Sequence, residues 1–100
     1  MNRKQLAIDF AKSLDYPEIR KIILYGSVSR GDDTNDSDID ILIITDDRKK
    51  IEDKVYSQVA DLLLEMEEYV SAKILTNTDY KRVKNTHFMS TVEKEGIVIG

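Results

Sequence analysis

The sequence has no cysteine and no tryptophan, and only one proline, one histidine and four glycines among its 100 residues. Without cysteine, neither a disulfide framework nor a thiolate metal site is available. No apolar run approaches the ~20 residues of a membrane span. The charged N-terminus is not followed by an apolar stretch, so it does not resemble a secretory signal. We therefore expect a cytoplasmic protein.

The charge balance and the chain length narrow the class of protein further. Nineteen acidic residues against fifteen basic ones give a formal net charge of −4. A general nucleic-acid-binding protein would normally present a basic face, so direct nucleic-acid binding is not expected. One hundred residues can build one ordinary core but no second substrate-binding lobe. We expect a single domain over residues 1–100.

Hydrophobic periodicity predicts an alternation of helices and strands in the order αβαβαβααβ. Helices are expected over residues 2–14, 27–30, 46–68 and 78–84 and from residue 86 to a C-cap at Gly96; strands are expected over residues 20–25, 38–45, 70–76 and 97–99. In the short second helix, Ser27 is the expected N-cap residue. The pattern predicts a small α/β (α+β) domain in which helices cover a mixed sheet of about four strands.

The segment from Gly26 to Asp40 contains five aspartates and lies between two apolar runs. The outer three aspartates are interpreted as a solvated acidic turn. Asp38 and Asp40 differ, because the apolar residues that follow draw their strand into the core. Alternate residues of a strand share a face, so both carboxylates project together. Two adjacent carboxylates repel each other unless a cation lies between them, and their oxygens suit Mg²⁺.

Other phosphate and metal motifs fail at this segment. Gly26 and Gly31 have the spacing of a Walker A loop, but Asp32 and Asp33 stand where lysine and Ser/Thr are required. A calcium-binding EF-hand loop lacks its central glycine and final glutamate. The dinucleotide fingerprint Gly-x-Gly-x-x-Gly is absent.

One family pattern fits the segment throughout. Gly26-Ser27, ten residues and then Asp38-Ile39-Asp40 resembles the signature of the DNA polymerase β-like nucleotidyltransferase superfamily. With its flanking strands, the Arg-Gly-Asp after the turn and the closing Lys-Glu-Gly-Ile-Val-Ile, the chain is similar to the minimal nucleotidyltransferases over nearly its whole length. The resemblance implies the polymerase β-like fold, with Asp38 and Asp40 as catalytic Mg²⁺ ligands. Gly26 and Ser27 would bind the phosphates of ATP, and Arg30 is a further candidate for phosphate contact.

Minimal nucleotidyltransferases commonly act as antitoxins, so the resemblance also implies a toxin as the partner. Active members transfer AMP from ATP to a tyrosine of a helical HEPN-domain ribonuclease toxin. The resemblance therefore implies a Mg²⁺-dependent protein adenylyltransferase with a HEPN partner, in a homo- or hetero-oligomer. Two alternatives remain open: an antitoxin that neutralises its partner by binding alone, and an enzyme that modifies a small molecule such as an antibiotic.

The chain departs from the family pattern at one position. Superfamily enzymes usually carry a third metal-binding carboxylate on the strand after the long helix, where this chain has Val70-Ser71-Ala72-Lys73. Ser71 aligns with the missing carboxylate, and by alternation Lys73 shares its face. The sequence therefore predicts slow or partner-dependent transfer, with Glu67 or Glu68 as less favoured substitutes for the third ligand.

Overall fold

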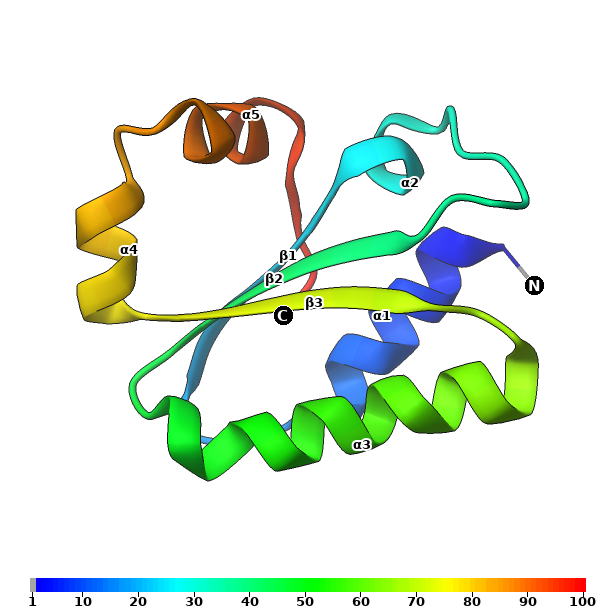
Figure 1. Cartoon of the computed structure of the whole chain (residues 1–100), viewed down its shortest axis with the longest axis horizontal. Helices are drawn as coiled ribbons and strands as arrows, with labels where there is room; N and C mark the ends of the chain where they lie inside the picture. The colour runs from blue at the N-terminus through cyan, green and yellow to red at the C-terminus, as the bar shows by residue number, and fades with distance from the viewer. Residues whose placement is uncertain (1) are drawn as a thin grey trace.

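The computed structural model describes residues 2–100, which build one four-stranded sheet with helices on both faces (Figure 1). The elements in chain order are α1 (Arg3–Ser13), β1 (Ile19–Tyr25), α2 (Gly26–Arg30), β2 (Ile39–Thr45), α3 (Arg48–Met66), β3 (Val70–Thr76), α4 (Asn77–Val83), α5 (His87–Glu95) and β4 (Ile97–Val98). This order confirms the predicted αβαβαβααβ pattern, with boundaries that differ by one or two residues. Within residues 2–100, no helix is both long and apolar enough to cross a membrane.

The sheet is mixed, as predicted, with the strand order β3-β2-β1-β4. β1 pairs antiparallel with both β2 and β4, whereas β2 and β3 run parallel. Parallel neighbours need a crossover connection, and the long helix α3 supplies it between β2 and β3. The register sets Tyr25 opposite Asp40 on one side of β2 and Ser71 opposite Asp40 on the other.

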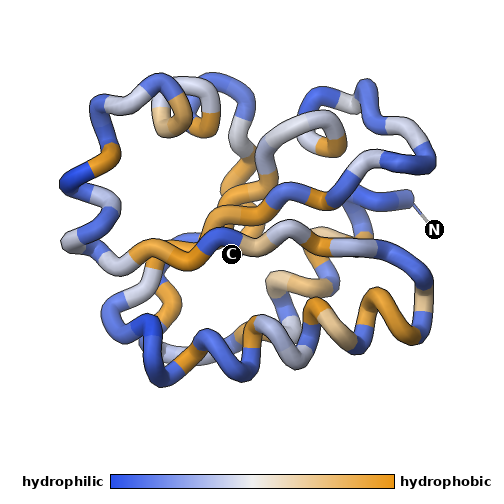
Figure 2. Tube along the Cα trace, in the orientation of Figure 1, coloured by the Kyte–Doolittle hydropathy of each residue, from blue (hydrophilic) through white to orange (hydrophobic). Residues whose placement is uncertain are grey.

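The two faces of the sheet carry two separate hydrophobic clusters. One lies under α1 and α3 and includes Ile39, Ile41 and Ile43 of β2. The other lies under α4 and α5 and includes Leu42. Figure 2 shows hydrophobic residues concentrated along the central strands, which are buried from both sides. This double burial explains why the strand sequences read as continuous apolar runs. By alternation, Asp40 belongs to the face that carries α4 and α5.

Side-chain caps fix the starts of most helices. Asp47 caps α3 by accepting a hydrogen bond from the Lys50 amide, and Thr86 caps α5 by accepting one from the Met89 amide. The start of α4 carries a full capping box between Thr76 and Asp79, one residue earlier than periodicity had predicted. Polar caps of this kind are local signals, which explains why the helix starts were predictable from sequence.

The predicted N-cap of the second helix is wrong. α2 begins at Gly26, so Tyr25 occupies the N-cap position and makes no side-chain capping bond. Ser27 therefore lies inside the first turn rather than before it. The helix starts one residue early because Gly26, with a φ of +76°, turns the chain directly from β1 into the helix.

Candidate active site

Asp38 and Asp40 lie at the N-terminal end of β2, on the face of the sheet that α5 covers in part. Asp38 directly precedes the strand and is exposed, whereas Asp40 is the second residue of the strand and is half-buried. Burial raises the pKa of Asp40 above its ordinary value, and the negative charge of Asp38 raises it further. The positive charges of Lys73 and Arg30 act in the opposite direction. The two carboxylates are thus close enough to repel each other, as the sequence predicted.

Gly26 and Asp40 are in direct contact across β1 and β2. A Cβ atom built on Gly26 would clash with Oδ2 of Asp40 and lie 3.2 Å from its Cγ. Gly26 also has a positive φ of +76°, a conformation that residues with a side chain rarely adopt. Two independent constraints therefore require glycine here, and together they bring the turn of α2 against the Asp40 carboxylate.

The first turn of α2 offers hydrogen-bond donors beside these carboxylates. The first amides of any helix lack an intrahelical acceptor, so those of Ser27 and Val28 can serve an anion. Among the described residues, the Ser27 hydroxyl makes no hydrogen bond, whereas the Ser29 hydroxyl donates one to the Gly26 carbonyl at 2.9 Å. The structure thus brings Gly26 into contact with Asp40, with Ser27 next to it in the α2 turn, while phosphate and metal binding at these residues stay predictions.

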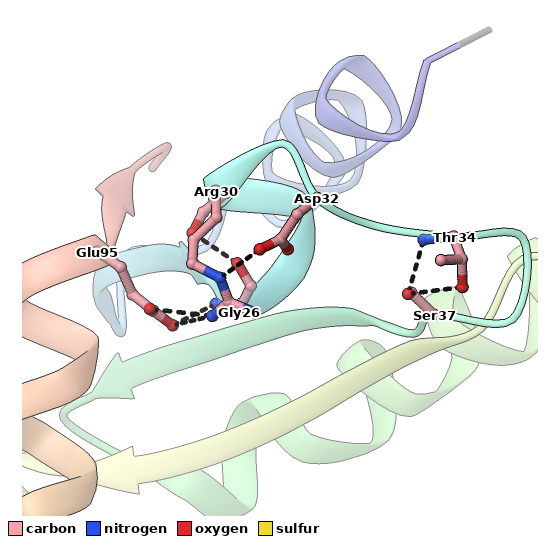
Figure 3. Close-up of polar contacts among 7 residues, drawn as sticks. Gly26, Arg30, Asp32, Thr34, Ser37 and Glu95 are labelled. Atoms are coloured by element: carbon pink, nitrogen blue, oxygen red, sulfur yellow. Dashed lines mark hydrogen bonds and ion pairs between the residues drawn. The ribbon is translucent and has the colours of Figure 1, made fainter.

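Arg30 is placed one helical turn further along α2 and is engaged with two carboxylates (Figure 3). Its Nε donates to Asp32 at 3.1 Å, and its Nη1 donates to both carboxylate oxygens of Glu95 at 3.0 Å. The hydrogen bonds with Asp32 and then Glu95 raise the pKa of Arg30 above its already high ordinary value. Arg30 is close to the site, but two carboxylates compensate its charge, so phosphate contact stays a prediction.

The loop between α2 and β2 is ordered by local bonds and ion pairs. Ser37 accepts a hydrogen bond from the Thr34 amide at 2.9 Å, and its own amide donates to the Thr34 carbonyl at 3.0 Å (Figure 3). Asp33 faces Arg3 of α1 at 3.6 Å, while Asp32 pairs with Arg30. Asp32 and Asp33 therefore hold the loop in place through ion pairs.

Two aromatic side chains and one lysine, Tyr25, Phe88 and Lys73, form a wall of the site on the α5 side. The Tyr25 ring packs edge-on against Phe88 with 5.6 Å between ring centroids, and the Lys73 ammonium lies 5.5 Å from the centre of the Phe88 ring. Burial, with a smaller contribution from Asp40, raises the pKa of Tyr25 to about 12, so its hydroxyl stays protonated at neutral pH. The wall combines an apolar surface with one positive charge, which is suited to a base and a phosphate.

The third carboxylate expected of the family is missing at the position that register identifies. Ser71 is the direct partner of Asp40 in the parallel pairing of β2 and β3, so both side chains share one face. Glu68 does not substitute, because it forms an ion pair with Arg3 at 3.1 Å, and Glu67 is an exposed residue that ends α3. Within residues 2–100, no three His, Cys, Asp or Glu side chains are grouped so that they could hold a metal ion.

The donor set nevertheless fits a magnesium ion in part. Mg²⁺ is usually held by one or two carboxylates, several waters and the phosphates of a nucleotide rather than by an all-protein cage. Asp38 and Asp40 supply two carboxylates, and the α2 turn beside them can hold the phosphates. The arrangement fits one nucleotide-bound Mg²⁺ ion better than a second ion that would need its own carboxylate.

Sequence reasoning missed Glu95 as a residue of this site. Glu95 ends α5, yet its Oε1 accepts a hydrogen bond from the Gly26 amide at 3.0 Å. Glu95 also raises the pKa of Asp40, as the last of several influences. The only signal was its place in the closing Lys-Glu-Gly-Ile-Val-Ile, which gives no indication of a partner 69 residues away in the chain.

Comparisons with known proteins agree with this geometry. Residues 8–100 match the family described as polymerase beta, nucleotidyltransferase. A relative from Methanocaldococcus jannaschii, named "Putative protein adenylyltransferase", is 34% identical over 102 residues, covering 99% of both chains. Two crystal structures share the fold. A toxin–antitoxin with AMP-PNP has a TM-score of 0.60 at 21% identity, and a mutant MntA-HpeT toxin–antitoxin has a TM-score of 0.62 at 19%.

In both structural matches, the alignment covers all of this chain and 73% of the solved chain. At these identities the structures establish the fold, whereas the family match and the archaeal relative establish the kinship. The matched residues include the α2 turn, Asp38, Asp40 and Glu95. The chain therefore belongs to the polymerase beta nucleotidyltransferase family and is a nucleotidyltransferase.

Proposed function

We propose that this nucleotidyltransferase is an antitoxin that uses Mg²⁺ and ATP to transfer AMP to a tyrosine hydroxyl of a HEPN-type ribonuclease toxin. The observation that carries the proposal is the contact of Gly26 with Asp40, which joins the phosphate-binding turn to the metal-binding strand. The protein-adenylyltransferase name of the archaeal relative and the toxin–antitoxin assemblies of the structural neighbours support it.

The residues of the site divide the work between them. The Ser27 hydroxyl and the free amides of the first α2 turn bind the triphosphate. Asp38 and Asp40 would hold Mg²⁺, which would neutralise negative charge on the phosphate oxygens. The acceptor oxygen forms a bond to the α-phosphorus as the bond to the bridging oxygen of pyrophosphate breaks, and the hydroxyl proton passes to solvent. Tyr25 and Phe88 form the apolar side of the site.

The size of the chain favours a protein as the acceptor. One sheet with five helices leaves the Asp38 side of the site open, because Asp38 itself is exposed. A small acceptor needs an enclosing pocket to be held in line with the α-phosphorus. A partner protein can bring both the tyrosine and the missing wall of the site.

A second candidate function, neutralisation of the toxin by binding alone, is favoured by one specific observation. Ser71 occupies the place of the third carboxylate, directly opposite Asp40, and supplies no charge to a cation. Lys73 adds a positive charge on the same side of the site. Loss of one anionic ligand should weaken the binding of the metal ion that activates the acceptor more than the binding of the metal ion that contacts the triphosphate. We therefore expect transfer that is slow or dependent on the partner.

The test is incubation of the protein with Mg²⁺, ATP labelled at the α-phosphate and the purified HEPN protein encoded nearest to it. Transfer should label the partner and add the mass of AMP to one tyrosine. The Asp38→Asn, Asp40→Asn double variant should abolish labelling without loss of the fold. The Asp36→Asn variant, in the same acidic loop, is the matched control and should keep full labelling.

The outcomes separate the candidate functions. Labelling of the partner supports adenylyl transfer. A partner that is neutralised by a stable complex without any labelling would favour the binding antitoxin. Labelling of a small hydroxyl compound with no partner present would favour the third alternative, a small-molecule enzyme. Mg²⁺-ATP affinity equal in the double variant and the wild type would refute the metal assignment.

A further inference from the structure

The carboxylate of Glu95 joins the last turn of α5 to the first residue of α2. It accepts hydrogen bonds from the Gly26 amide at 3.0 Å and from Nη1 of Arg30, which lies 3.0 Å from each carboxylate oxygen. Figure 3 shows Glu95 entering from the end of α5 and meeting both partners at α2. One side chain thus binds the backbone at the start of the turn and the guanidinium near its end.

The position of Glu95 is fixed by the backbone on both sides of it. The Gly96 amide donates to the Val92 carbonyl at 2.7 Å, which closes the end of α5. β4 then pairs directly with β1, with Leu24 opposite Ile97. On the helical side, Met89 and Val92 are buried in the cluster beneath α5. The Glu95 side chain is only 19% exposed, so its carboxylate is held rather than free in solvent.

The bonds of Glu95 leave the other donors of α2 free for a ligand. The Gly26 amide donates to Glu95, while the Ser27 and Val28 amides, which have no intrahelical acceptor, remain available. A triphosphate that displaced Glu95 would have to break its bonds to both Gly26 and Arg30. It would also leave an unpaired carboxylate beside Asp40. The geometry favours a carboxylate that stays in place while the nucleotide binds next to it.

The contact with Gly26 has a consequence for Asp40. Gly26 lies against the Asp40 carboxylate, so any shift of the Gly26 backbone changes the distance between the turn and the metal-binding strand. Glu95 holds that backbone directly, and it also orients Arg30 toward the turn. An arginine–carboxylate pair at the surface contributes little by itself, so the bond to the partly buried amide is the significant one.

We propose that Glu95 is a positioning residue, which fixes the Gly26–Ser27 turn against Asp40 and so makes nucleotide affinity depend on the last turn of α5. The inference rests on the proposed function, because it assigns the α2 turn to ATP. Glu95 itself does not touch the nucleotide. Its effect passes through the backbone of Gly26 and through the orientation of Arg30.

The first experiment measures the turn without any nucleotide. Amide hydrogen exchange of Gly26 and Ser27 is compared by NMR in the wild type and in Glu95→Ala. Loss of a hydrogen bond to a charged group should speed exchange at Gly26 by at least about tenfold. The control is Glu93→Gln on the same helix, whose carboxylate bonds the Tyr80 hydroxyl instead. Unchanged exchange at Gly26 in Glu95→Ala would overturn the proposal.

The second experiment measures affinity for Mg²⁺ with a non-hydrolysable ATP analogue by calorimetry. Glu95→Ala should weaken binding about tenfold, and Glu95→Gln, which keeps an acceptor for Gly26 but loses the charge, about threefold. Glu93→Gln should bind as the wild type does. Thermal unfolding checks the fold, and if Glu95→Ala does not fold, Glu95→Gln carries the test. Equal or tighter binding by the folded variants overturns the proposal, and tighter binding identifies Glu95 as a competitor of the phosphates.

The two readouts separate this inference from the proposed function. A wild type that binds the analogue while the Glu95 variants bind equally well refutes the positioning role alone. A wild type that does not bind the analogue refutes the proposed function, and the nucleotide role of Glu95 with it.

Discussion

At the scale of single residues, the site concentrates negative charge in a place that the folded chain only partly compensates. Asp40 is half-buried and faces Asp38 and Glu95, and its positive neighbours are Lys73 and Arg30. Such a cluster is unfavourable for the free protein and favourable for a bound cation. The free energy of unfolding should therefore depend on pH and on Mg²⁺, and replacement of Asp40 should change both dependences.

Replacement of Asp40 by asparagine should stabilise the metal-free protein at neutral pH. The pKa of Asp40 is raised in the folded state, so the folded protein binds this proton more tightly than the unfolded chain does. Its contribution to stability is then greatest below the ordinary aspartate pKa and is lost as pH rises through the raised value. Asparagine carries no charge at neutral pH, so Asp40→Asn should raise the free energy of unfolding by about 1 kcal/mol, the effect of relieving one like-charge contact.

Urea unfolding from pH 3 to pH 8 checks this expectation. The advantage of Asp40→Asn over the wild type should shrink as the pH falls toward 3. Added Mg²⁺ should reduce the advantage at neutral pH, because a cation that binds only the folded wild type stabilises it. A variant that is less stable than the wild type at pH 7 without Mg²⁺ would contradict the assignment.

Ser71→Asp should strengthen metal binding by restoring a carboxylate opposite Asp40. Register puts the two side chains on one face of neighbouring parallel strands, within reach of one cation. The variant should raise Mg²⁺ affinity or the rate of adenylyl transfer by about tenfold, the effect of one charged ligand contact. Isothermal calorimetry with Mg²⁺ and the labelled-ATP assay provide the measurements.

The control for this substitution lies on the opposite face of the same strand. Ala72 packs against the cluster under α1 and α3, and Ala72→Ser changes polarity on β3 without approaching Asp40. It should alter stability but not the Mg²⁺ affinity of the folded protein. A fast wild-type enzyme in which Ser71→Asp is neutral or harmful would show that the third ligand belongs elsewhere.

At the scale of elements, the junction between α5 and β4 determines where Glu95 lies. Gly96 occupies this junction with an extended backbone, which confirms the predicted C-cap position. A Cβ on Gly96 would meet the Val92 carbonyl oxygen and lie 2.7 Å from Cγ2 of Ile23. There is room for a hydrogen atom here and for nothing larger.

Gly96→Ala should therefore destabilise the protein by about 1–3 kcal/mol, the range for an added methyl group in a tightly packed place. The measurement is the free energy of unfolding in urea. Ser90→Ala on the exposed side of α5 is the matched control and should stay within about 0.5 kcal/mol of the wild type. Equal stability of Gly96→Ala and the wild type would mean that β4 can move away from β1 without loss.

At the scale of the whole molecule, exposed apolar side chains gather in two places, and Tyr56, Tyr69 and Phe88 are exposed in addition. Leu63, Leu64 and Met66 are exposed near the end of α3, with Leu64 81% exposed, and Ile97 and Val98 are exposed on the edge strand β4. Exposed apolar surface that is contiguous commonly marks a protein contact. This distribution is consistent with a protein that works in a complex.

Purification from the native host should yield a stable complex with a helical HEPN-type protein. The physical reason is that burial of exposed apolar side chains contributes about 25 cal/mol per Å². Size-exclusion chromatography with light scattering gives the mass of the complex, and mass spectrometry identifies the partner. If the chain elutes alone and no HEPN gene lies beside its own gene in the host, the proposed partner is wrong.

The sequence by itself determined the elements and the two aspartates at the centre of the site. Hydrophobic period, polar caps and turn residues act over a few positions, so each of the nine elements could be predicted in order. Alternation along the expected strand predicted a common face for Asp38 and Asp40, although the strand begins at Ile39 and only Asp40 lies on it. The single domain, the ligands Mg²⁺ and ATP and the HEPN partner stay predictions.

Only the tertiary structure decided how these parts meet. Glu95 bonds the Gly26 amide across 69 positions of the chain, and no local pattern encodes a contact over that distance. The Asp40 carboxylate of the next strand lies against Gly26 and leaves no room for a side chain at the start of α2. Ser71 faces Asp40 because α3 returns the chain to pair β3 with β2 in one register. Strand order and packing, which involve the whole chain at once, fix such contacts.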